Sequence, residues 1–247
     1  SGAVPDCDDT PGALIALSEI SRRCELSTDD RRQLEDAITP GIEWMLGLQN
    51  RDKGWPTFCR GWGKLPFDRS GSDLTAHVLR ALAAWQSKVP ESQLTRALNS
   101  GFEYLANTQH ANGSWLPLWF GNQDDPNEEN PIYGTSKVLL AYSDWGREED
   151  EVAKRGLQWL VEQQNPNGGW GSSVASQDEQ FDDESTATVI ALSYLESSVE
   201  ETSLAVETII AIDKGQKYRE IIEKGLMWLL DKVEKDTWTN PSPIGFY

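Results

Sequence analysis

The sequence predicts an all-α fold, an α/α toroid of helical hairpins, from two observations. A short phrase with Gln six residues before Trp occurs three times, at Gln49 to Trp55, Gln109 to Trp115 and Gln164 to Trp170. Before each copy lies a segment with apolar residues at helical spacing and with Gly three residues ahead of an aromatic residue. Such a repeat indicates an array of like units of about 55 to 60 residues, so the sequence can be aligned with itself.

The helices that precede the phrases form a first, amphipathic set. They contain Gly41, Gly101 and Gly156, and a fourth copy with Gly225 runs into a decayed phrase at 232–238. Within the phrase, Gly can end a helix and Trp can pack on the next unit. We therefore interpret the Gln-to-Trp phrase as a structural clasp rather than as chemistry.

A second, more apolar set of helices is expected at 10–17, 75–82, 135–142 and 186–194. Low polarity indicates burial on most sides, as in an inner layer that the first set surrounds. This favours a toroid over an open superhelix. The expected domain is a single α/α barrel over 1–247, and four or so hairpins fall short of the about six that a closed ring takes. We therefore expect a fragment of a larger protein.

Composition limits the partners and the compartment. The net charge of −18, with scattered Lys and Arg, opposes binding to nucleic acid or anionic lipid unless a local basic patch overcomes the repulsion. Three widely spaced cysteines fit a reducing compartment, so a cytoplasmic protein is expected. No apolar run approaches the roughly 18 residues of a membrane span.

Superposing the second set of helices on Thr10, Thr75, Thr135 and Thr186 aligns functional residue types. Two residues earlier, this alignment places Asp8, Asp73, Tyr133 and Glu184 at one mouth of the ring. Two residues later it places Gly12, His77 and Lys137, about one helical turn further in. His77 is therefore expected near the level of the aspartates.

Three carboxylates crowd the start of the first helix, at Asp6, Asp8 and Asp9. A helix needs one N-cap, so capping does not explain all three. Like charges raise one another's pKa, and a carboxyl group that stays protonated near neutrality can act as a general acid. His77 is interpreted as functional beside them, and His110, inside a phrase, as loop surface.

Two segments resemble the triterpene cyclase family, that is, squalene-hopene and oxidosqualene cyclases. Residues 4–10 (VPDCDDT) resemble its Asp-X-Asp-Asp acid motif, and residues 72–79 (SDLTAHVL) resemble the bacterial Asp-Val-Thr-Ala-His segment. The three phrases resemble the repeated Gln-Trp motif of the family, so the match spans nearly the whole chain. Pro11-Gly12 and Ser242 depart from the family pattern.

The resemblance implies an α/α barrel and class II cyclisation of a polyprenoid alkene or epoxide, with no metal and no cofactor. Asp8 resembles the proton donor, Asp6 a carboxylate that holds the network and His77 its charge partner, with Asp9 and Asp73 in support. The chemistry is coherent, because protonating an alkene requires a strong acid in a dry cavity.

Aromatic faces suit the carbocation that follows, because a nucleophile would quench it. The resemblance implies that Phe58, Trp119, Tyr133 and Phe246 line the substrate cavity, and the repeat adds Glu184. The implied partners are a squalene-like polyprenoid and the missing barrel segments or second domain of the parent protein. Peripheral membrane contact of the parent and dimerisation through an open edge are further expectations.

Two other functions remain open. The barrel could be a non-catalytic module that binds a polyprenoid or a partner chain. It could also be another α/α toroid enzyme, such as a protein prenyltransferase, which would need a zinc site of Asp, Cys and His, or a carbohydrate-processing enzyme with paired carboxylates.

Overall fold

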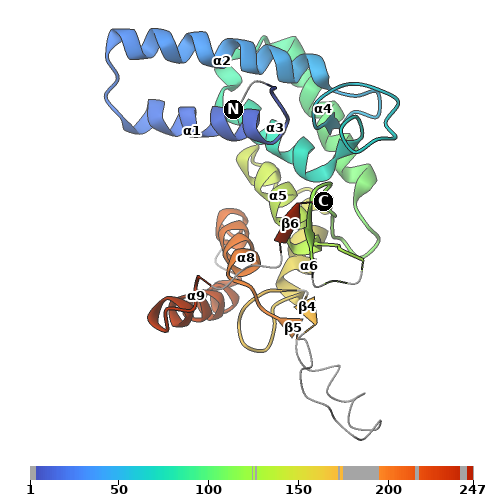
Figure 1. The fold of residues 1–247 in the computed structure, drawn as a ribbon, viewed down its shortest axis with the longest axis vertical. Helices are drawn as coiled ribbons and strands as arrows, with labels where there is room; N and C mark the ends of the chain where they lie inside the picture. The colour runs from blue at the N-terminus through green and yellow to red at the C-terminus, as the bar shows by residue number, and fades with distance from the viewer. Residues whose placement is uncertain are drawn as a thin grey trace, which may run out of the picture. The chain divides into compact units, whose positions relative to one another are not determined.

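The structure is a computed structural model that describes residues 4–123, 125, 127–171, 173–174, 195–214, 217–239 and 244–246. The prediction of an all-α fold is confirmed, since no strand among these residues is longer than three residues. The helices are α1 (Asp9–Arg23), α2 (Thr28–Leu48), α3 (Ser72–Ala84), η1 (Gln86–Lys88), α4 (Glu91–Thr108), α5 (Pro131–Asp144), α6 (Glu151–Glu162), α8 (Val199–Ile212) and α9 (Arg219–Glu234) (Figure 1).

The chain divides into two compact units. The first consists of Ser1–Ala111 with Lys137–Ala153, and the second of Asn112–Ser136 with Lys154–Tyr247. In the first unit α1 and α2 lie side by side as an antiparallel hairpin, α1 packs on α3, and α3 packs on α4 (Figure 1). In the second unit α8 packs on α9.

Short antiparallel strand pairs close the loops. In the first unit β1 (Trp55–Pro56) pairs with β2 (Ser70–Gly71). In the second unit β3 (Phe120–Asn122) pairs with β6 (Ile244–Phe246), and β4 (Ser173–Val174) pairs with β5 (Leu195–Glu196).

The burial predicted for the second set of helices holds for α3 but not for α1, which buries only Pro11, Leu14 and Ser18. Most residues of α3 are buried, whereas α2 and α9 keep long exposed faces. The reason is local composition, because α3 presents apolar or small side chains on nearly every side. The polar start of α2 is stabilised by a capping box, in which Ser27 Oγ accepts the Asp30 N–H and the Asp30 carboxylate accepts the Ser27 N–H.

All three Trp residues of the clasps are fully buried and use the same hydrogen bonds. The backbone N–H of each Trp donates to a Thr hydroxyl of the following helix: Trp55 to Thr75 at 3.0 Å, Trp115 to Thr135 at 3.0 Å, and Trp170 to Thr202 at 2.9 Å. Two indole N–H groups donate back to the preceding helix: Trp55 to Met45 O and Trp170 to Leu160 O, each at 2.8 Å. The clasps at Trp55 and Trp170 therefore tie one helix of each set together.

The Gln side chains link successive helices of the first set. Each amide donates to a carbonyl of the next such helix: Gln49 to Ala97 at 3.3 Å, Gln109 to Val152 at 2.9 Å, and Gln164 to Ile221 at 2.8 Å. Beyond these helices, Gly113 and Gly168 have positive φ in the turn before Trp. The expectation that Gly ends the helix is wrong, because α2, α4 and α6 end before the Gln.

A glycine in the next helix of the first set leaves room for the indole ring of Trp55 and for that of Trp170. A Cβ on Gly101 would lie 3.0 Å from Cζ3 of Trp55, and a Cβ on Gly225 would lie 2.9 Å from Cζ3 of Trp170. The distance at Gly225 is too short for a real Cβ contact, and the distance at Gly101 would require the ring to shift by a few tenths of an ångström. The glycine of the Gly-x-x-aromatic segment is thus explained at Gly101 and Gly225, and the prediction that Trp packs on the next unit is confirmed for Trp55 and Trp170.

The third clasp corrects the repeat alignment. Trp170 bonds to Thr202 at the start of α8, not to Thr186. The residue aligned with Asp73 and Tyr133 is therefore Glu200, two residues before Thr202. Glu184 and the helix expected at 186–194 lie outside the described residues.

The fourth phrase has lost the clasp geometry, as its decayed sequence indicates. Helix α9 continues to Glu234, and Asp236 ends it with a positive φ while Thr237 N–H donates to Lys232 O. Trp238 is 52% exposed, unlike the buried Trp of the other phrases.

Candidate active site

Asp6 takes the capping role at the start of α1. Its Oδ1 atom accepts the N–H of Asp8 at 2.8 Å and of Asp9 at 2.6 Å. The Asp8 side chain makes no capping hydrogen bond. One carboxylate therefore satisfies the helix N-terminus, and the carboxylate of Asp8 is left for another use.

Cys7 anchors the acid motif to the loop after β1. The Cys7 side chain is fully buried, and its N–H donates to Thr57 O at 2.9 Å. Burial raises the pKa of the Cys7 thiol well above its ordinary value, and the charges of Asp6 and Asp8 act in the same direction. The thiol therefore contributes packing, and the hydrogen bond from Cys7 N–H to Thr57 O fixes the backbone next to Asp8.

Asp8 and His77 form the central contact of the site. Helix α1 packs on α3, and His77 Nδ1 lies 3.2 Å from Asp8 Oδ1. The side chain of Asp8 retains 39% of its exposure and that of His77 retains 17%. The sequence prediction that His77 lies at the level of the aspartates is confirmed for this pair.

The pKa of Asp8 is lowered, not raised. The hydrogen bond with His77 is the largest cause, partial burial opposes it, and electrostatic attraction from His77 and Lys137 adds to the lowering. The raised pKa expected among the three crowded carboxylates is therefore not found at Asp8. Because Asp6 turns toward backbone N–H groups, the nearest strong influence on Asp8 is His77.

The residues two positions after the aligned Thr meet around this pair. A Cβ on Gly12 would lie 3.5 Å from Cε1 and 3.7 Å from Nε2 of His77, an ordinary contact distance. Lys137 acts on Asp8 electrostatically. The repeat alignment placed Gly12, His77 and Lys137 together, but it did not assign Lys137 a role, although its shared position with His77 was the available signal.

Asp73 and Asp9 take different places. Asp73 is 4% exposed in the first turn of α3, where its charge helps burial raise the pKa of Tyr104. Asp9 is exposed in the first turn of α1, where its negative charge interacts favourably with the helix dipole and stabilises the helix. The positions of Asp73 and Asp9 do not test the supporting catalytic roles that the resemblance implies for them.

An aromatic cluster forms separately in the second unit. The rings of Phe120 and Tyr133 lie 5.0 Å apart between centroids at 31°. Strand pairing places Phe120 opposite Phe246, and Trp119 adjoins the strand with a half-buried side chain. Sequence reasoning missed Phe120, which no repeat or motif marks; its ring contact with Tyr133 is seen only in the folded chain.

Phe58 lies in the first unit and is 42% exposed. It belongs to the loop 57–69 between β1 and β2, so a cavity-lining role for Phe58 stays a prediction. His110 is exposed in a loop, as predicted. Among the described residues no group of three or more His, Cys, Asp or Glu side chains could hold a metal.

The family model for the squalene-hopene cyclase C-terminal domain matches residues 2–245. The chain belongs to this family. The resemblance carried by the acid motif, the His77 segment and the Gln-to-Trp phrases is therefore confirmed, and the chain is a cyclase domain by family.

Two curated relatives show how much of a longer protein this cyclase domain represents. Enfumafungin synthase efuA of Hormonema carpetanum is 31% identical over 98% of this chain, which spans 18% of that relative. A probable squalene–hopene cyclase of Sinorhizobium fredii is 33% identical over 70% of this chain, which spans 26% of that relative.

Solved structures share the fold at low sequence identity. The ent-copalyl diphosphate synthase from Streptomyces platensis has a TM-score of 0.62 at 20% identity, covering 92% of this chain and 35% of its own. The type II terpene cyclase MstE from Scytonema, in complex with geranylgeranyl dihydroxybenzoate, has a TM-score of 0.56 at 14% identity, covering 92% of this chain and 54% of its own. The prediction of an α/α toroid is confirmed.

Proposed function

We propose that this cyclase domain supplies the acid of a class II terpene cyclase and that Asp8 protonates the terminal alkene or epoxide of a polyprenoid. The observation that supports this most is the 3.2 Å contact between Asp8 and His77, made by a carboxylate that capping leaves unused. A carboxyl group beside an imidazole, where α1 packs on α3, suits proton transfer.

The lowered pKa of Asp8 defines its part in the step. When protonated, Asp8 is a stronger acid than an ordinary carboxyl group, so transfer of its proton to an alkene carbon is less unfavourable. The alkene π electrons form the new C–H bond, and the O–H bond electrons remain on Asp8. His77 and Lys137 stabilise the carboxylate that results, and Asp6 holds the backbone beneath it.

The proposed substrate is a squalene-like polyprenoid. Relatives of this chain are squalene–hopene cyclases, and the related fold of MstE holds a geranylgeranyl compound. Tyr133 and Phe120, whose rings are tilted at 31° to each other, offer aromatic faces that would stabilise a carbocation by about 0.5 to 2 kcal/mol each. The positions of such faces along the cavity would determine at which carbon cyclisation ends, and so the product. The other proposed cavity residues are Trp119, Phe246, Phe58 and Glu184.

We also propose that the 247-residue chain alone does not turn over. The side chain of Asp8 keeps 39% of its exposure, so water reaches the acid and would quench a cation formed there. The relatives are several times longer, and their remaining segments would cover this site. In a cell, the full protein is proposed to work in the cytoplasm with peripheral membrane contact.

The test is product formation by the full-length parent protein. Squalene or oxidosqualene presented in detergent should yield a cyclic isomer, identified by mass spectrometry, whereas the 247-residue chain should yield none. Polyprenoid binding without any cyclic product, unchanged by Asp8→Asn and His77→Ala, would instead support a non-catalytic binding module.

A further inference from the structure

The loop 57–69 has a defined conformation built around one buried carboxylate. Asp68 is 3% exposed and accepts two backbone N–H groups of the loop, including that of Trp62 at 3.0 Å. A Cβ on Gly61 would lie 2.2 Å from Asp68 Oδ2, so only glycine fits there. The neighbouring side chains of Arg60 and Trp62 are therefore presented from a fixed backbone.

The turn of the first clasp, at 50–52, is tied to the end of this loop. Asn50 Nδ2 donates to Asp68 O at 2.9 Å and to Ser70 Oγ at 3.0 Å. Arg51 follows Asn50 in the turn and is exposed. These hydrogen bonds thus hold two segments together, each of which presents one arginine to solvent.

The turn and the loop form the wall of one surface hollow of about 630 Å³. It is lined by Asn50, Arg51, Asp52, Arg60, Trp62 and the two glycines beside Trp62. Pockets that bind small molecules have volumes of roughly 300 to 1,000 Å³. The hollow is therefore large enough for a small organic ligand, and its two arginines and its indole are open to solvent.

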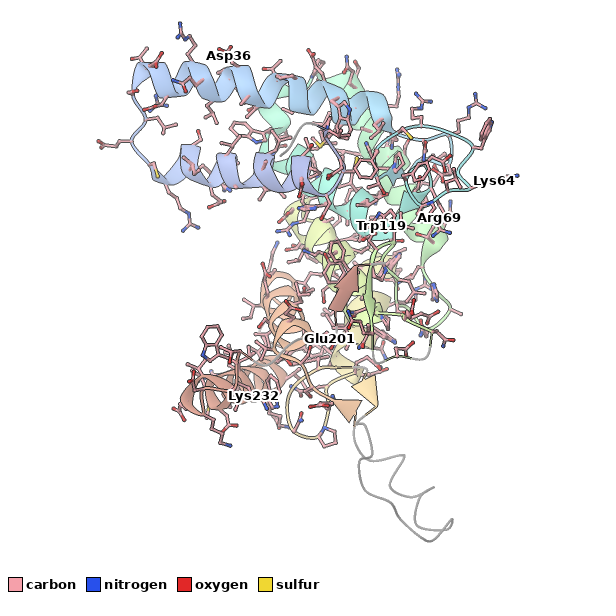
Figure 2. All side chains as sticks on the ribbon, viewed as in Figure 1. Asp36, Lys64, Arg69, Trp119, Glu201 and Lys232 are labelled. Carbon is pink, nitrogen blue, oxygen red and sulfur yellow. The ribbon has the colours of Figure 1, made fainter. Side chains whose placement is uncertain are left out.

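The cations around the hollow are not neutralised by carboxylates. No salt bridge within the described part of the chain includes any of Arg51, Arg60, Lys64 and Arg69. Asp68 is buried in the loop, and Asp52 accepts hydrogen bonds from Ser70 Oγ and a backbone N–H. Figure 2 shows Lys64 and Arg69 on this loop, with Lys64 at its outer edge. In a chain of net charge −18, this cluster of positive charge favours an anion.

We propose that this hollow binds a soluble phosphate ester with an apolar organic group. Guanidinium groups bind phosphate oxygens through paired hydrogen bonds, and Arg51 and Arg60 supply two of them against the single carboxylate of Asp52. The indole of Trp62, which is 88% exposed, offers a flat apolar face to the organic group. Asp8 does not line the hollow, so this site does not depend on the proposed cyclisation.

The test is isothermal titration calorimetry of the 247-residue chain with two probes. Inorganic phosphate and phenyl phosphate share the anion and differ in the organic group. In about 150 mM sodium chloride, where the Debye length is about 8 Å, diffuse attraction is screened. Phenyl phosphate should bind at one site with a Kd below about 1 mM, and about threefold more tightly than inorganic phosphate, because its ring packs on the indole.

Substitutions in the hollow should separate the two parts of the ligand. Arg51→Gln and Arg60→Gln should each weaken the binding of both probes about tenfold, since each removes charge-assisted hydrogen bonds. Trp62→Ser should remove the preference for phenyl phosphate and leave the binding of inorganic phosphate nearly unchanged. Circular dichroism checks the fold of every variant, and the two arginines come from different segments, so each tests the site independently.

Two control variants separate the hollow from general effects. Lys64→Gln removes the same charge from the same loop but outside the hollow, so affinity should change less than about twofold. Asp8→Asn should bind both probes normally. A failure of the proposed catalysis would therefore leave this test unaffected.

Three results would overturn the proposal of a phosphate ester site. One is the absence of saturable binding of phenyl phosphate. Another is an equal loss of affinity in Lys64→Gln and Arg60→Gln, which would indicate diffuse attraction without a defined site. The third is binding to vesicles that contain phosphatidic acid without any binding of phenyl phosphate, because the phosphate would then belong to a lipid.

Discussion

His77 Nδ1 lies 3.2 Å from Asp8 Oδ1 although 69 positions separate the two residues in the chain. This contact is the largest cause of the lowered pKa of Asp8. His77→Ala should therefore raise the pKa of Asp8 toward the ordinary value of about 3.9. Carboxyl-carbon NMR titration measures it, with His110→Ala as the control on an exposed loop. An unchanged Asp8 titration in His77→Ala would show that the contact is not formed in solution.

The same lowered pKa predicts how stability depends on pH. A carboxylate whose pKa is lower in the folded state stabilises the fold above its unfolded pKa, and this stabilisation is lost as the pH falls through the folded pKa. At pH 7, Asp8→Asn should therefore cost at most about 1 kcal/mol, because Asp8 is partly exposed and screened. In urea unfolding the gap from the unsubstituted chain should close on acidification. A gap that is constant with pH would contradict the assignment.

Glycines in two helices should respond in opposite directions to a methyl group. Gly225→Ala places a Cβ 2.5 Å from Val206 and 2.9 Å from Trp170, so a loss of about 1 to 3 kcal/mol in unfolding free energy is expected. Gly47→Ala in α2 meets nothing within 4 Å and should stabilise the chain by about 0.5 kcal/mol, because Ala favours helices. Similar effects of the two changes in thermal or urea unfolding would refute the clasp packing.

The three thiols should differ in reactivity. Cys24 and Cys59 are exposed, whereas Cys7 is buried and has a raised pKa. A thiol reagent should label two of the three cysteines in the folded chain, and the third only in denaturant. Peptide mass mapping identifies the protected residue. Rapid labelling of Cys7 would show that the segment held by the hydrogen bond from Cys7 N–H to Thr57 O opens readily.

The clasps and the acid pair could be predicted because their signals are local or repeated. Gln164 and Trp170 repeat a phrase, and His77 shares a repeat position with Gly12, so alignment of the chain with itself was sufficient. The repeat alignment used Thr186 and did not consider Thr202, which also begins a helix; the hydrogen bond from Trp170 identifies Thr202 as the clasp residue.

Other features of the site could not be predicted, because they depend on the direction of side chains and on the pairing of strands that are distant in the sequence. The lowered pKa of Asp8 comes first from its hydrogen bond with His77, and the capping role of Asp6 depends on the direction of its side chain; proximity in sequence reveals neither. The pairing of Phe120 with Phe246 joins strands more than a hundred residues apart. Arg51 and Arg60 line one surface cavity from different segments, which their positions in the sequence do not show.

The most direct test of the central claim is the turnover of the Asp8→Asn variant in the full-length parent protein. Asn keeps the size of the side chain but cannot donate the proton, so cyclic product should fall by about a thousandfold or more. Asp36→Asn, an exposed change on α2, should retain full turnover. If Asp8→Asn forms cyclic product at the rate of the unsubstituted protein, Asp8 is not the acid and the proposed function is wrong.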